Sequence, residues 1–133
     1  MAAVNLTLTH GLLIGGDTLT DVVLREPTAG DIIEAQEESE KLVYAVEGDG
    51  SRIVPTLVAS PTMVGVHVLR RQIVKIGNLS GPLELDMIKR LHPEDFGQLQ
   101  ARADELDAAM SAEIASREVA QRGRDDGDGG GAG

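Results

Sequence analysis

Residues 60–76 read Ser-Pro-Thr-Met-Val-Gly-Val-His-Val-Leu-Arg-Arg-Gln-Ile-Val-Lys-Ile, and this stretch decides the predicted fold. Ser60 followed by Pro61 is a helix-start signal, because serine caps a first turn and proline fits the first helical position. Apolar side chains then recur at the spacing of one helix face: Val66, Leu69, Ile73 and Ile76. Three valines lie off that stripe: Val64, Val68 and Val74. We therefore predict a central helix over 61–76 that is apolar on more than one side.

The chain before this helix predicts an antiparallel β-hairpin over residues 4–25. Residues 4–9 alternate apolar and polar side chains, which is the period of a half-buried strand. Residues 18–25 are rich in β-branched and apolar side chains and predict the partner strand. Gly15-Gly16-Asp17 lies between them and supplies residues that tolerate turn conformations, while Gly11 predicts a kink in the first strand.

A helix over about 29–46 is expected next, because Pro27 stops the second strand and acidic residues follow in the first helical turn. Its apolar side chains fall roughly on one side: Ile32, Ile33, Ala35, Leu42, Val43 and Val46. The acidic run at 34–40 admits two interpretations, a solvated helix face or a surface for a basic partner. Residues 51–60 fit either an extended segment or a broken helix, and the sequence does not decide between them.

The C-terminal part of the chain predicts a short helix over 83–91 and a long helix over 93–122. Apolar side chains form one seam along the long helix: Phe96, Leu99, Ala103, Leu106, Met110 and Ile114. At 1.5 Å per residue this helix extends about 40 Å, which is longer than a small domain needs. Its second half is therefore a candidate surface for a partner or for self-association. Residues 123–133 are rich in Gly and Asp and predict a disordered tail.

These elements together predict an α+β fold, with residues 1–122 forming a single domain. In this fold an N-terminal antiparallel β-hairpin is followed by a small helical bundle with a long C-terminal helix and a disordered tail. One Phe, one Tyr and no Trp are present, so the core must be built from aliphatic side chains.

Composition narrows the classes of function. The net charge is −10, with 12 basic against 22 acidic residues, which argues against nucleic acid because its phosphates require Lys and Arg. No stretch approaches the roughly 18–20 apolar residues that span a bilayer. The first residues lack the pattern of a signal peptide, so we expect a cytoplasmic location and no membrane partner. The absence of Cys excludes disulfides, thiolate metal sites and Cys nucleophiles.

No catalytic, cofactor-binding or metal-binding motif is present. The only histidines are His10, His67 and His92, and none has the spacing of a zinc ligand pair. The glycines form no phosphate loop, and no serine lies in a nucleophile elbow. Glu94 and Asp95 are neighbours, but adjacent helical side chains point about 100° apart, and first-turn acids stabilise a helix start. We therefore expect a protein that binds another protein and is not an enzyme.

Three short motifs follow one another in a recognisable order. The first is Arg25-Glu26-Pro27-Thr28-Ala29-Gly30-Asp31, which matches an R-x-P-T-x-G-D turn after a strand. The second is Ile76-Gly77-Asn78-Leu79-Ser80-Gly81-Pro82, which follows the central helix. The third is Leu91-His92-Pro93-Glu94-Asp95-Phe96, an L-x-x-x-D-F/Y pattern that opens the last helix. Over about residues 4–110 this order resembles the tail assembly chaperone family of Mu-like and related tailed phages. Two stretches depart from the family pattern: 34–50 and 53–61.

The resemblance implies a non-enzymatic chaperone in the host bacterial cytoplasm. Such a protein binds the tape-measure protein and keeps it soluble until tail tube polymerisation, when tail tube protein displaces it, and it is absent from the finished virion. The alternative is a small structural virion protein, for the tail or for head completion, that stays in the particle. We expect apolar side chains outside the core to bind the partner: Val64, Val68, Leu106, Met110 and Ile114.

Overall fold

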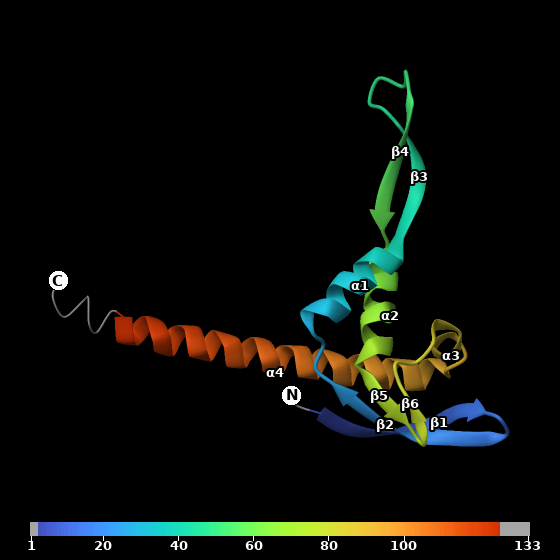
Figure 1. Ribbon diagram of the computed structural model, residues 1–133, viewed down its shortest axis with the longest axis vertical. Helices are drawn as coiled ribbons and strands as arrows, with labels where there is room; N and C mark the ends of the chain where they lie inside the picture. Colours follow the sequence, from blue (N-terminus) through green and yellow to red (C-terminus); the bar gives the residue numbers. More distant parts are fainter. Residues whose placement is uncertain (1–2, 126–133) are drawn as a thin grey trace.

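The computed structural model describes residues 3–125, and it confirms an α+β fold with an N-terminal antiparallel hairpin and a long C-terminal helix (Figure 1). The elements in chain order are β1 (Ala3–Ile14), β2 (Asp17–Arg25), α1 (Ala29–Ser39), β3 (Glu40–Val46), β4 (Ile53–Ala59), α2 (Pro61–Gln72), β5 (Ile73–Ile76), β6 (Leu79–Ser80), α3 (Leu85–Lys89) and α4 (Pro93–Asp125).

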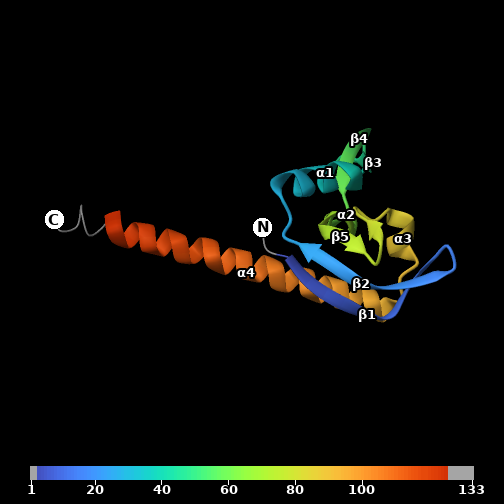
Figure 2. The ribbon, with the colours of Figure 1, turned by 60° about the horizontal axis from the view of Figure 1, so that its bottom comes forward.

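One antiparallel sheet has the strand order β1-β2-β5-β6 and carries the core on one side. Its first two strands are the predicted hairpin, in which Val4 pairs with Leu24 and Ile14 with Asp17. α4 packs along β1, α2 packs against α4, and α1 packs on α2 (Figure 2). The core between them is aliphatic: Leu8, Leu12, Val22, Leu24, Val66, Leu69, Ile73, Ile76, Leu83, Ile88, Leu91, Leu99, Ala103 and Leu106. Two parts stand away from this body, the β3–β4 ribbon and the second half of α4 (Figure 1).

The predicted helix over 61–76 is wrong at its C-terminal end. α2 ends at Gln72, and Ile73–Ile76 form β5, which pairs with β2. Both isoleucines are buried, so the spacing locates core side chains although their last turn is a strand. A β-branched run beside the open edge of β2 gains a ladder of hydrogen bonds as a strand, and helical periodicity cannot reveal that gain.

The predicted helix over 29–46 is also wrong in its second half. α1 ends at Ser39, whose hydroxyl donates to the carbonyl of Ala35 at 2.6 Å, and residues 40–46 form β3. β3 pairs with β4, so the stretch 51–60, which the sequence left open, is extended over most of its length. Of the apolar side chains predicted on one side of this helix, only Ala35 is buried, and α1 packs through Asp31, Ala35 and Ser39.

The C-terminal boundaries differ in detail from the prediction. α3 covers Leu85–Lys89, which is shorter than the predicted 83–91. α4 continues to Asp125, so residues 123–125 are helical where a disordered tail was expected. The remaining part of the predicted tail, 126–133, lies outside the described residues.

The carboxylate of Asp95 fastens the start of α4 to β1. Its side chain is fully buried, and it accepts the N–H of Thr9 at 2.8 Å, that of Gly11 at 2.9 Å and that of His10 at 3.2 Å. The pairing of β1 with β2 is interrupted over residues 8–11, where Gly11 adopts a φ of 82°, so these N–H groups need another acceptor. Asp95 of the third sequence motif therefore makes a tertiary contact that holds α4 against β1. The contact is made at the predicted kink around Gly11.

The second motif brings two backbones into close contact. Gly81 donates its N–H to the carbonyl of Val74 at 2.8 Å. A Cβ at this position would lie 1.9 Å from the carbonyl oxygen of Ile73, a distance that no side chain tolerates. Gly81 therefore allows the chain after β6 to cross close over β5.

The first motif locks the end of β2 to the start of α1. The guanidinium of Arg25 donates to both carboxylate oxygens of Asp31, at 2.6 and 3.2 Å. Thr28 and Asp31 form a capping box, in which each side chain accepts the backbone N–H of the other residue. The hydrogen bond from Arg25 holds the pKa of Asp31 below its usual value, although burial acts in the opposite direction.

Replacing Asp95 by Asn should lower the free energy of unfolding by about 2–3 kcal/mol, because an amide presents an NH2 group to backbone donors that need an acceptor. Chemical denaturation followed by far-UV circular dichroism measures the change. Glu94→Gln is the control, since the neighbouring side chain is exposed and its loss should cost no more than about 0.5 kcal/mol. Equal costs for the two variants would contradict the assignment.

The stabilisation from Asp31 should depend on pH. A carboxyl group with a lowered folded pKa stabilises the fold above its unfolded pKa, near about 4, and this contribution is lost as the pH falls through the lower folded value. At pH 7 Asp31→Asn should cost about 1–2 kcal/mol, and the difference from wild type should shrink below pH 4. Unfolding free energies measured at neutral and acidic pH test this, and a difference that stays constant would refute it.

Candidate partner-binding surface

A groove of about 560 Å³ lies where α1 and α2 meet α4. α1 contributes Ile32, α2 contributes Gly65 and Val68, and α4 contributes Ala103 and Met110. The α2 wall is open at Gly65, where an added Cβ would meet nothing within 4 Å. A groove with apolar walls between helices is the form that accepts the apolar face of another helix.

The five sequence-predicted partner residues fall in different environments. Val68 and Met110 are both half-buried and line the groove from α2 and α4. Ile114 is 47% exposed on the part of α4 beyond the groove. Val64 is half-buried on α2 but does not line the groove, and Leu106 is buried in the core. The structure therefore brings Val68 and Met110 together and removes Leu106 from the accessible side chains.

The sequence did not predict that Ile32 and Gly65 line the groove. The sequence places Ile32 on the apolar side of a longer helix, whereas in the structure it lines the groove and is 41% exposed. Gly65 offers no side chain, so an apolar pattern gives no signal for it. The only signal in the sequence is the glycine itself. A glycine inside a helix destabilises it by about 1 kcal/mol relative to alanine, so its presence there indicates a position where a side chain is disfavoured.

Two carboxylates of α4 give the groove a negative rim. Asp104 and Asp107 both line it. Partial burial raises the pKa of Asp107, and the negative charge of Asp104 adds to this effect. A partner that carries Lys or Arg beside its apolar face would complement this rim, whereas an acidic partner would be repelled.

Beyond the groove, α4 continues as a helix that projects from the body (Figure 1). Residues 111–119 are all exposed, and they include Ile114 and Val119. An ion pair between Glu113 and Arg117, one helical turn apart, stabilises this part of α4. Within residues 3–125 no helix, α4 included, combines the length and the apolar character needed to cross a membrane.

Two carboxylates of the acidic run at 34–40 form ion pairs with arginines of α2. Glu38 accepts from Arg70 at 2.7 Å and also from Arg71, and Glu34 accepts from Arg71 at 3.2 Å. Glu37 is exposed in the same run. The solvated-face interpretation therefore holds for only part of the run, since Glu34 and Glu38 help to hold α1 on α2.

His67 is a buried residue of α2. Its Nδ1 accepts the Nε–H of Arg70 at 3.0 Å, and the ring is buried. Burial lowers the pKa of His67, and the positive charge of Arg70 lowers it further. The ring also lies 3.1 Å from the carboxylate of Glu38, so it is part of the contact between α1 and α2.

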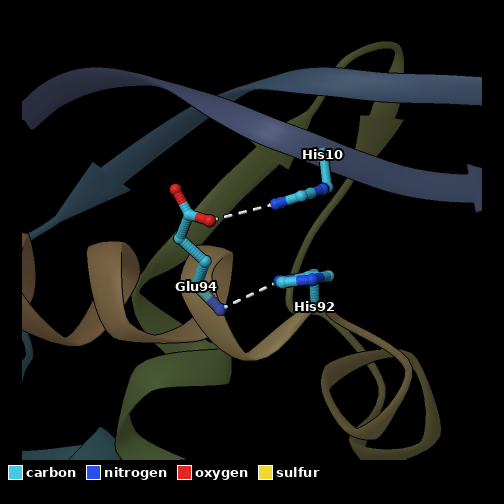
Figure 3. Close-up of side chains that lie close together, drawn as sticks. All are labelled: His10, His92 and Glu94. Carbon is cyan, nitrogen blue, oxygen red and sulfur yellow. Dashed lines mark hydrogen bonds and ion pairs between the residues drawn. The ribbon is translucent and has the colours of Figure 1, made fainter.

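One group of side chains has the composition of a metal site. His10 on β1 lies beside His92 and Glu94 at the start of α4, with potential ligand atoms within 4.8 Å of one another (Figure 3). The imidazole rings are stacked, with centroids 3.6 Å apart and planes 11° from parallel, so their lone pairs run side by side and do not converge on one point. His92 Nδ1 also accepts the N–H of Glu94 at 3.1 Å, which is a helix-capping contact. In this arrangement the three side chains act as a packing and capping group.

A comparison with protein-family models matches residues 8–124 to the family described as tail assembly protein gp41. This span includes most of the sheet, the groove and nearly all of α4. The chain belongs to this family. No solved structure matches it.

Curated relatives support the same assignment. A probable tail assembly protein gp41 of Escherichia phage Mu is 42% identical over 104 residues, which cover 78% of this chain and 65% of the relative. A probable tail assembly protein FS-gp41 of the same phage is 44% identical over 94 residues, which cover 71% of this chain and 47% of the relative. The Mu-like prophage FluMu protein gp41 of Haemophilus influenzae is 32% identical over 112 residues, which cover 84% of both chains. The chain thus spans about two thirds and about half of the two phage Mu relatives.

Proposed function

We propose that this chain is a tail assembly chaperone of a tailed phage. It binds the tape-measure protein without catalysing a reaction and keeps it soluble until tail tube protein displaces the chaperone. It acts in the host cytoplasm and is absent from the mature virion. Membership in the tail assembly protein gp41 family supports a role in tail assembly, and the groove supports the binding of a helical client.

The observation that carries the proposal is the continuity between the groove and the free part of α4. Ala103, Asp107 and Met110 line the groove at four- and three-residue spacing, which is one face of a helix. The next position on that face is Ile114, which is exposed. A client helix seated in the groove therefore meets a further apolar strip at its end, formed by Met110 and Ile114, which suits a long client better than a closed pocket does.

The charges of the chain fit the same role. The acidic rim at Asp104 and Asp107 favours a client helix with basic residues beside its apolar face. The net charge of −10 gives a loaded complex like-charge repulsion, which opposes aggregation.

Filling the groove should block client binding while the fold stays intact. Gly65→Leu adds a side chain into the groove, and it should stabilise α2 by up to about 1 kcal/mol because leucine is the better helix former. Co-expression with the tape-measure protein should then give insoluble client. Gly97→Leu is the matched control, since Gly97 also has free space around it but lies on α4 outside the groove. If both variants keep the client soluble, the groove is not its binding site.

Charges placed on the exposed strip should have the same effect. Met110→Asp with Ile114→Asp should abolish solubilisation of the tape-measure protein in a co-expression and pull-down assay. The melting temperature should stay within a few degrees of wild type, because neither residue belongs to the core. Ala108→Asp with Ala115→Asp adds the same charge on the opposite side of α4 and should leave binding unchanged. Unchanged solubility of the client with the first pair would exclude the strip.

The alternative function, a structural virion protein, differs from the chaperone function in whether the chain is present in the mature virion. Mass spectrometry of purified virions separates the two functions. Copies retained in mature particles at the level of other tail components would replace the chaperone proposal, whereas a chaperone should be lost before maturation.

A further inference from the structure

The β3–β4 ribbon exposes a continuous apolar face. Its pairing places the following residues side by side on that face: Leu42 with Leu57, Tyr44 with Pro55, and Val46 with Ile53. All except Pro55 are 56–69% exposed, and Pro55 is exposed as well. An isolated two-stranded ribbon is at best marginally stable in water, whereas three or more strands with an apolar face are stable. The ribbon therefore has the form of part of a larger sheet.

Only one of its two edges is fully open to another strand. The N–H of Glu47 donates to the carbonyl of Arg52 at 2.9 Å, so odd-numbered residues of β3 turn their N–H and C=O groups toward β4. The even-numbered residues Leu42, Tyr44 and Val46 turn theirs outward, where they can pair with a further strand. On the outer edge of β4 the corresponding set contains Pro55, which has no N–H and blunts that edge.

We propose that β3 pairs antiparallel with β3 of a second copy of this chain, across a two-fold axis at Tyr44. In this register Leu42 lies opposite Val46 of the second copy, and Tyr44 lies opposite Tyr44. The outward N–H and C=O groups of each β3 then pair with those of the other. The product is a four-stranded sheet, β4-β3-β3-β4, whose apolar faces join into one.

Charges at the two ends of β3 favour this register. With the axis at Tyr44, Lys41 of β3 lies opposite Glu47 of the second copy, and symmetry repeats the pair on the other side of the axis. Both residues turn their backbone groups toward β4, so they form a non-hydrogen-bonded pair across the new interface, which is the pair type that brings side chains closest. Glu47 directly follows β3 and pairs with Arg52 of its own ribbon at 2.9 Å, so Lys41 would join this pair as a second cation. The ribbon carries two basic and three acidic side chains within a chain of net charge −10, so two copies meet where their repulsion is small.

This inference stands apart from the proposed function, because it concerns the ribbon and not the groove. Sedimentation equilibrium of the wild-type chain should show a monomer–dimer equilibrium at micromolar concentrations. Lys41→Glu alone, or Glu47→Lys alone, should raise the dissociation constant by roughly tenfold or more, because each homodimer then holds two like-charge pairs. A mixture of the two variants should recover dimers, since every pair in the heterodimer is again of opposite charge. A wild-type chain that stays monomeric near 100 μM, or variants that dimerise like wild type, would overturn the proposal.

A cross-link tests the position of the axis. The chain has no Cys, so Tyr44→Cys introduces a single thiol at the proposed axis. Opposed residues in a hydrogen-bonded pair have Cα atoms about 5.5 Å apart, within the range that a disulfide spans. Mild oxidation should therefore give a covalent dimer at least tenfold faster for Tyr44→Cys than for Leu57→Cys, which places an equally exposed thiol on β4. Equal rates for the two variants would refute this register.

Discussion

The hydrogen bonds that the buried Asp95 carboxylate accepts join parts of the chain that lie more than 80 residues apart in sequence. They satisfy the N–H groups that the interruption of β1 leaves without a strand partner, and they fix where α4 begins on the sheet. Because α4 is placed by this contact, its next turns pack under α2, and the groove forms at their crossing. A change at Asp95 therefore acts on the binding surface through the position of a whole helix.

Much of the fold could be predicted because its signals are local. The strand alternation, the turn at Gly15-Gly16 and the helix start at Ser60-Pro61 depend on neighbouring residues, and the structure contains each of them. Residues 40–46 could not be assigned in this way. Leu42, Val43 and Val46 suit one side of a helix as well as a strand, and what decides between these structures is the ladder with β4, a partner that the sequence does not specify.

The candidate site was predictable only in part for a related reason. Apolar spacing points to Val68 and Met110, but the crossing of α2 over α4 decides that they share one groove. Leu106 lies on the same seam, and the length of the helix places it among the expected partner residues, but the core extends far enough along α4 to bury it. Ion pairs such as Glu38 with Arg70 are invisible to a charge count, which treats each carboxylate on α1 as solvated.

The two projecting parts of the molecule have a hydrodynamic consequence. α4 alone has 33 residues, or about 50 Å at 1.5 Å per residue, whereas a compact chain of 133 residues has a radius of gyration of about 14 Å, equivalent to a sphere about 36 Å across. With the ribbon pointing in another direction (Figure 1), the translational friction of a single copy exceeds that of a sphere of equal mass. On a size-exclusion column calibrated with round proteins, a lone 14.0 kDa chain will elute early and be assigned too large a mass. Elution volume alone therefore overstates how many copies travel together.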